Sequence, residues 1–163
     1  MSRADYDDLA EILKDDDVMY AYEGAFSDEE VERWLQKQLE RYERDGFGLN
    51  AAVIRQTGEM IGQCGLTLQE VKGRTVIETG YLFKKAYWHM GYATEAATAC
   101  RDYAFNVLGA DEVFAIIRDT NIASQNVATR LGMTQVDAFV KHYRGIDMPH
   151  FIFPRLNFQL HPF

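Results

Sequence analysis

The stretch IETGYLFKKAYWHMGYATEAATACR, residues 77–101, decides the fold because its hydrophobic pattern changes from that of a strand to that of a helix. Residues up to Phe83 are largely β-branched or aromatic, which predicts a strand, and Gly80 within it predicts a bulge or a close backbone approach. From Gly91 onward small and apolar residues recur at helical spacing, and Gly109 supplies a stop. The chain is therefore predicted to run from a strand directly into a long helix.

The junction between that strand and that helix, KKAYWHMGYA, has the composition of an anion-binding site. The first backbone N–H groups of a helix have no internal partners and lie at the positive end of the helix dipole. Gly91 and Ala93 leave room for an anion to approach. Residues 72–91 carry four lysine or arginine residues against one glutamate, although the chain has a net charge of −8. The junction is predicted to bind phosphate groups.

Two signatures in the chain together resemble those of the GNAT N-acetyltransferase superfamily. The run from Trp88 to Ala93 resembles its pyrophosphate signature, (Q/R)-x-x-G-x-(G/A), with Trp88 in place of the polar first residue. The run from Asn121 to Met133 resembles a second signature, N-x-x-S-x-x-V-x-x-x-x-G-F, of the branch that acetylates the N-termini of ribosomal proteins. One such match is weak evidence, because ordinary strand-to-helix turns produce it, whereas two in order are far more specific.

The resemblance implies an α+β (mixed α/β) fold with a central mixed, mostly antiparallel sheet of about six strands and helices on both faces. Two parallel strands, Thr75–Phe83 and Glu112–Arg118, are expected to diverge in a V-shaped splay that holds a thioester cofactor. Residues 1–163 are expected to form one N-acetyltransferase domain, with a loose tail over residues 154–163. The hydrophobic pattern and the capping residues predict further helices at 5–14, 27–44 and 122–131, and strands at 49–56, 60–71, 133–143 and 149–153.

The resemblance also implies acetyl-CoA as co-substrate, held mainly by the protein backbone and without a metal. Backbone groups of Tyr81, Leu82 and Phe83 would hold the pantetheine, and the Leu82 N–H would stabilise the oxyanion. Asn121 would bond the pantetheine arm, next to Ser124. The backbone N–H groups expected to hold the pyrophosphate are those of His89, Met90, Gly91, Tyr92, Ala93 and Thr94.

Acetyl transfer to an amine needs an acid for the leaving thiolate and a base for the amine proton. Ser124 occupies the serine of the second signature and is the candidate acid, although a serine at this helix position also serves to bond first-turn N–H groups. Glu78 on the cofactor strand is one candidate base. His142 is another, because histidine changes charge near neutral pH, and His150 is a third. The alternative for His142 is an exposed residue on the last hairpin without a catalytic role.

The residues expected to contact the acceptor lie before the helix predicted from Ser27, which flanks the acceptor site in the resembled fold. They are Tyr20, Tyr22, Glu23 and Phe26. The acceptor itself is expected to be a primary amine, either a protein N-terminus or a small molecule. The alternative function is a catalytically silent sensor or interaction module that binds CoA without transferring the acetyl group.

Composition excludes several other classes of function. The 25 acidic and 17 basic residues oppose binding to nucleic acid, which needs a basic face. No apolar run has the length of a membrane span and no targeting segment is visible, so a cytoplasmic protein is expected. Cys64 and Cys100 lack metal-ligand spacing and are expected to be buried free thiols. The family begins with a strand, whereas only Met1–Ala4 precede the first predicted helix, so either the sheet lacks that strand or the sequence starts inside the native chain. Either case leaves a sheet edge open, which would permit a homodimer.

Overall fold

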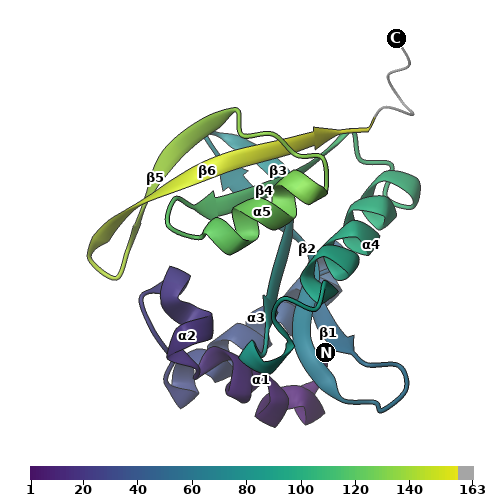
Figure 1. Cartoon of the computed structure of the whole chain (residues 1–163), viewed down its shortest axis with the longest axis vertical. Coiled ribbons are helices and arrows are strands. Elements are labelled where there is room, and N and C mark those ends of the chain that lie inside the picture. Colours follow the sequence, from purple (N-terminus) through teal and green to yellow (C-terminus); the bar gives the residue numbers. More distant parts are fainter. Residues whose placement is uncertain (158–163) are drawn as a thin grey trace.

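The computed structural model of the chain describes residues 1–157, whose strands form one six-stranded sheet in the order β1-β2-β3-β4-β6-β5 (Figure 1). All neighbouring strands are antiparallel except β3 and β4, which are parallel. The strands are β1 Leu49–Val53, β2 Met60–Val71, β3 Arg74–Phe83, β4 Glu112–Arg118, β5 Asp137–Tyr143 and β6 Ile146–Leu156. The predicted fold class is confirmed.

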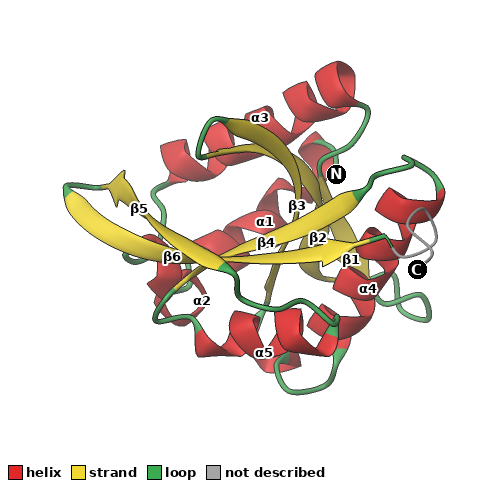
Figure 2. Cartoon of the chain, turned by 90° about the horizontal axis from the view of Figure 1, so that it is seen from above, coloured by secondary structure: helices red, strands yellow, loops and turns green. Residues whose placement is uncertain are grey.

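Helices cover both faces of this sheet, as predicted. Figure 2 shows α3 on one side of the sheet and α4 and α5 on the other. The helices are α1 Tyr6–Leu13, α2 Asp16–Met19, α3 Asp28–Asp45, α4 Tyr92–Asn106 and α5 Ile122–Arg130, with 3₁₀ turns at Arg3–Asp5, Tyr20–Tyr22 and Lys85–Tyr87. The start of α3 confirms the predicted capping box: the Ser27 N–H donates to Glu30 Oε2 at 2.8 Å, and the Glu30 N–H donates to Ser27 Oγ at 3.3 Å.

Two apolar clusters hold these layers together. On one face, buried residues of α4 and α5 pack against β2 and β4, with Ala97, Ala104 and Val113 completely buried. The small side chains of α4 let it approach the sheet closely. On the other face α1, α2 and α3 bury Leu9, Leu35 and their neighbours against Met60 of β2. Burial of apolar area in these clusters is the main source of stability.

The parallel pair opens into a V. β3 and β4 share a single registered residue pair, Glu78 with Phe114, and no later residues of the two strands pair. β3 continues from Glu78 to Phe83 along β2, and β4 continues from Phe114 to Arg118 along β6. The sheet therefore divides after Glu78, and the gap between the strands is where the site lies.

Three predicted boundaries need correction. The strand predicted from Met133 begins only at Asp137, because the Met133 N–H bonds the Ala128 carbonyl and so finishes the end of α5. The last strand is longer than the predicted 149–153. The tail predicted to be loose from residue 154 is ordered through Leu156, because β6 still pairs with β4 there, while residues 158–163 lie outside the described residues. Pro154 is tolerated because β5 pairs with β6 only as far as Ile152.

Within residues 1–157, no strand precedes α1, so β1 forms one edge of the sheet. The edge offers backbone groups for pairing, as does any edge strand. A homodimer formed through it remains a prediction.

Gly65 of β2 is the glycine that the packing requires most strictly. A Cβ there would lie 2.0 Å from the carbonyl oxygen of Gly48 and 2.8 Å from Leu49 Cα, both backbone atoms of the crossing chain. We expect Gly65→Ala to lower the free energy of unfolding by about 3 kcal/mol, because backbone must move to relieve the clash. Denaturant unfolding would measure this.

The matched control is Gly80→Ala, since Gly80 is paired directly opposite Gly65 on β3. A Cβ at Gly80 meets only Leu49 Cδ2, at an ordinary 3.5 Å. The control should leave the free energy of unfolding nearly unchanged. Equal losses in the two variants would contradict the argument from close approach.

Candidate active site

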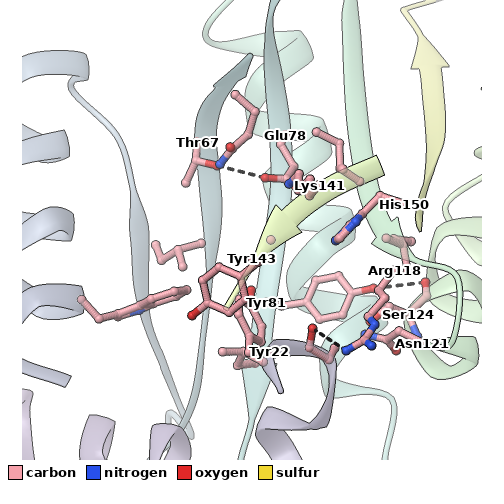
Figure 3. Close-up of a pocket in the computed structure, with 18 of the residues that line it drawn as sticks. Tyr22, Thr67, Glu78, Tyr81, Arg118, Asn121, Ser124, Lys141, Tyr143 and His150 are labelled. Carbon is pink, nitrogen blue, oxygen red and sulfur yellow. Dashed lines mark hydrogen bonds between the residues drawn. The ribbon is translucent and has the colours of Figure 1, made fainter. Parts of the chain in front are cut away.

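A pocket of about 800 Å³ lies between the diverging strands. Its walls come from the α2–α3 region, the middle of β2 and β3, β4, the first turn of α5 and the β5–β6 hairpin. Figure 3 shows Glu78, Thr67 and Lys141 at one end of it and Arg118, Asn121 and Ser124 at the other. Predicted site residues that line the pocket are Tyr22, Phe26, Glu78, Tyr81, Leu82, Asn121, Ser124, His142 and His150.

The pairing of β3 with β2 decides which backbone groups face the pocket. The Lys84 N–H donates to the Ile61 carbonyl at 2.9 Å, which makes this a hydrogen-bonded pair. In an antiparallel ladder such pairs alternate, so the Leu82 N–H points to Gln63 of β2 in the register of the two strands. The N–H and carbonyl of Tyr81 point the other way, toward the gap left by β4. The backbone donor of β3 that faces the gap is therefore that of Tyr81, and the role of Leu82 as oxyanion donor stays a prediction.

Glu78 lies where the two strands separate. Its Oε2 accepts a hydrogen bond from Thr67 Oγ1 at 3.3 Å, and the Ile116 backbone also interacts with its carboxylate. Burial raises the pKa of Glu78 above its ordinary value, and interactions with Lys141, Thr67, Ile116 and Arg41 oppose that rise. A carboxylate with a raised pKa, held in a pocket, has the properties of a general base.

Ser124 and Asn121 are positioned by the start of α5. The Asn121 side-chain oxygen caps the helix by accepting from the Ser124 N–H at 3.0 Å, as predicted, and it also accepts from the Tyr20 hydroxyl at 2.7 Å. The Asn121 amide group is thus left as a donor. The Tyr81 hydroxyl donates to the Ser124 carbonyl at 3.3 Å, which joins β3 to α5 across the V.

The two histidines differ in their surroundings. His142 has a side chain 70% exposed, and its Nδ1 lies 2.9 Å from Asp147 Oδ1 across the hairpin. His150 is half-buried, and its Nδ1 lies 2.9 Å from the Met148 carbonyl, so Nδ1 carries the proton and Nε2 keeps a lone pair. Burial lowers the pKa of His150.

The start of α4 is not part of the pocket wall but has the geometry of an anion cradle. Gly91 is the N-cap residue, with a φ of 89°, and no side chain caps the helix. A Cβ on Gly91 would meet no atom within 4 Å. The first N–H groups of α4, with His89, Met90, Tyr92, Ala93 and Thr94 around them, are consequently open to a ligand.

The lysines next to this cradle are already neutralised, contrary to the sequence-based expectation that they add positive charge there. Lys84 pairs with Asp8 at 2.8 Å and with Glu11 at 2.7 Å, and Lys85 pairs with Asp17. They tie the β3–α4 connection to α1 and α2. Backbone N–H groups, rather than these side chains, supply the attraction for an anion.

The predicted acceptor residues divide into two groups. Tyr22 and Phe26 are part of an aromatic cluster with Trp34, with ring centroids 5.8–6.2 Å apart, and all three line the pocket. Glu23 instead pairs with Arg118, and Tyr20 bonds Asn121, so both brace the wall from outside.

Sequence reasoning missed several functional candidates. The sequence left open whether Trp34 faces a ligand or the core; it lines the pocket, and its Nε1 donates to Gln63 Oε1 at 3.0 Å. Arg118 and the basic residues of α3 and β5 were not noticed. The basic residues of α3 recur at i, i+4 spacing, which places their charges on one face of the helix beside the apolar stripe. That spacing was a visible signal in the sequence.

Comparisons with known proteins agree with this arrangement. The family described as "Acetyltransferase (GNAT) domain" matches residues 1–134. The uncharacterized protein YkkB of Bacillus subtilis is 38% identical over 91% of this chain and 84% of its own. A GNAT-family acetyltransferase from Bacillus anthracis has a TM-score of 0.80 at 22% identity, covering 96% of this chain and 91% of that one. RimL, a ribosomal L7/L12 α-N-protein acetyltransferase solved with coenzyme A, has a TM-score of 0.78 at 15% identity, covering 96% and 90%.

These findings make the protein an acyltransferase. It belongs to the GNAT acetyltransferase family, and the family predicted from the two signatures is confirmed. Ribosomal-protein acetyltransferases are among the structures that share its fold. In the part of the chain that the structure describes, no helix has the length and apolar character to cross a membrane, and no group of three potential metal-ligating side chains occurs.

Proposed function

We propose that the protein transfers the acetyl group of acetyl-CoA to a primary amine by direct attack in a ternary complex. The observation that carries the proposal is the V between β3 and β4, into which the Tyr81 backbone groups point without a strand partner. An acyl carbonyl placed there would be polarised by that N–H, and an amine could reach it from the pocket. Incubating the full chain with acetyl-CoA and primary amines, and following acetylation by mass spectrometry, tests the proposal.

The open start of α4 would hold the CoA pyrophosphate. Uncapped N–H groups at a helix N-terminus bind phosphate well, and the left-handed Gly91 leaves space beside them. The free amide donor of Asn121 suits a pantetheine carbonyl. Phe83 contributes less directly, because its carbonyl accepts from Trp88 Nε1 at 2.9 Å and thereby fixes the connection to α4.

Tyr81 rather than Leu82 is the proposed backbone donor to the oxyanion. The Leu82 side chain instead packs against the cluster formed by α1 to α3. Glu78, three residues before Tyr81 on β3, is the proposed general base. It is supported over His142 by burial, since a base held within a pocket is oriented more precisely than one on an exposed hairpin.

Ser124 is the proposed acid for the leaving thiolate. We expect Ser124→Ala to lower kcat about 10²-fold while CoA affinity is retained, because a proton donor is lost but no binding group is. Steady-state kinetics and calorimetry with CoA measure the two quantities. An unchanged kcat would leave Ser124 as a helix-start residue only.

The acceptor is proposed to enter past Tyr22 and Phe26, with Glu23 and Tyr20 supporting the wall through Arg118 and Asn121.

We also propose a cytoplasmic location, which is supported by two unbonded thiols, Cys64 and Cys100, with sulfur atoms 3.6 Å apart. The competing function, a silent CoA-binding sensor, predicts CoA binding without turnover of any amine.

A further inference from the structure

Four basic side chains line the acceptor side of the pocket, and we call them the cationic rim. Arg33, Lys37 and Arg41 lie on α3 at i, i+4 spacing, so they follow one face of the helix at steps of about 6 Å. Lys141 reaches the same pocket from β5, and Figure 3 shows it beside Glu78.

The cationic rim lacks direct ion-pair partners. Among the described residues, none of the four forms an ion pair with a carboxylate, although the chain carries an excess of acidic residues. Lys141 lies 5.6 Å from the centre of the Phe139 ring, a weak interaction that leaves its charge available. By contrast, Arg118 at the other end of the pocket is paired with Glu23.

Arg41 is the rim residue whose side chain is fixed in position by the surrounding protein. Its side chain is more than nine-tenths buried, at 8% exposure, yet it lines the pocket. Its Nη1 donates to Gln38 Oε1 at 3.1 Å, and the same oxygen accepts from the Leu49 N–H at 3.2 Å. Gln38 is completely buried, so Arg41 is held in one orientation. A buried guanidinium with a neutral partner is unfavourable until an anion reaches it.

The carboxylates of the pocket do not balance this charge. Glu30 accepts from the Ser27 N–H and pairs with Arg144, so it is already committed. Glu78 is the remaining carboxylate of the lining residues, so one carboxylate stands against the four cations of the rim. A polycationic acceptor would be repelled here, whereas an anion would be attracted.

We propose that the cationic rim binds a carboxylate or phosphate of the amine acceptor, so that the acceptor is an acidic amine such as an amino acid or a peptide with acidic residues after its N-terminus. This inference rests on the proposed function and specifies its substrate class. The rim also assists the reaction, because nearby positive charges lower the pKa of the acceptor's ammonium group and favour the neutral, nucleophilic amine. Within the rim, burial lowers the pKa of Lys37, and the neighbouring charges of Arg41 and Lys141 add to that effect.

The test compares matched amines that differ only in charge. Aspartate and its diamide, and the peptides Ala-Asp-Asp-Ala and Ala-Asn-Asn-Ala, would be assayed with the full chain and acetyl-CoA. The acidic member of at least one pair should have a kcat/KM about 10²-fold higher, and the pair that responds separates a free amino acid from a peptide N-terminus. Lys37→Gln should reduce that advantage about 10-fold and Arg41→Gln about 10²-fold.

The control is Arg44→Gln, which removes the same charge from the same helix at a residue that does not line the pocket. It should keep the advantage of the acidic acceptor. Because Arg41 is buried, the folding of Arg41→Gln needs to be checked by circular dichroism. If that variant unfolds, Lys37→Gln still tests the proposal, because Lys37 is exposed.

Calorimetric titration of the same amines in the presence of CoA separates failure of this inference from failure of the proposed function. Binding that depends on the acidic group and on Lys37, without acetylation, would support the anion site and refute the transferase. Equal kcat/KM values for charged and neutral acceptors, unaffected by Lys37→Gln, would overturn the anion site and leave the transferase standing. Absence of both binding and turnover would overturn both.

Discussion

Gly91→Glu is expected to abolish measurable CoA binding, with a loss of affinity of more than about 10³-fold. The substituted side chain would occupy the open space beside the first N–H groups of α4 and place a negative charge where the pyrophosphate is expected. Replacing glycine at a φ of 89° also strains the backbone by about 1–2 kcal/mol, which affects folding rather than the ligand. Calorimetry with CoA measures the loss of affinity.

A second glycine next to α4 provides a control for the backbone strain. Gly109, beyond the other end of α4, has a φ of 66° and open space around its Cβ position. Gly109→Glu therefore introduces the same charge and a similar backbone strain far from the proposed phosphate site. It should bind CoA like the wild type, and unchanged CoA affinity in a folded Gly91→Glu protein would refute the cradle.

Local signals were sufficient for most of the fold. Ser27 and Glu30 predicted the start of α3, because a capping box acts within one turn of helix. β2 and β4 were predicted with their observed bounds, since turns flank β2 on both sides and β4 is an apolar run ended by polar residues. The errors lie where pairing outweighs local pattern: β6 extends past Pro154 because β4 continues beside it.

The site was predicted less completely, for a physical reason. Sequence places Glu78, Ser124 and Asn121 on their elements, but it does not say which neighbours neutralise a charge. Lys84 and Lys85 were expected to face an anion and instead pair with acidic residues of α1 and α2, which are about 70 positions away in the chain. The cationic rim was missed for the same reason, since the absence of a partner becomes visible only when α3 and β5 meet.

Backbone direction was a further limit. The assignment of the oxyanion donor to Leu82 came from family resemblance, and neighbouring residues of a strand look equivalent in sequence. The register of β3 on β2 distinguishes them, because alternate N–H groups point to opposite sides of a strand. This distinction can be tested only indirectly, since backbone groups survive side-chain substitution.

Glu78→Gln is expected to lower kcat/KM about 10³-fold and to remove the acidic limb of its pH profile. A carboxylate base acts only when deprotonated, so the rate should rise as pH passes through its pKa. Because burial raises the pKa of Glu78, that limb should lie above the ordinary glutamate value of about 4.3. The amine acceptor adds a limb of its own at higher pH, so the position of one limb is not diagnostic.

The comparison between variants is what identifies the base. His142→Gln should leave the acidic limb in place, because the His142 side chain is largely exposed on the hairpin and bonds Asp147. His150→Gln is the stricter control, since the half-buried His150 keeps a lone pair on Nε2 and has a lowered pKa, and a limb from it would also fall in the acidic range. Loss of the limb in His150→Gln with its retention in Glu78→Gln would transfer the role to His150. Retention in all three variants would mean that the amine reaches the V already neutral, as the cationic rim favours.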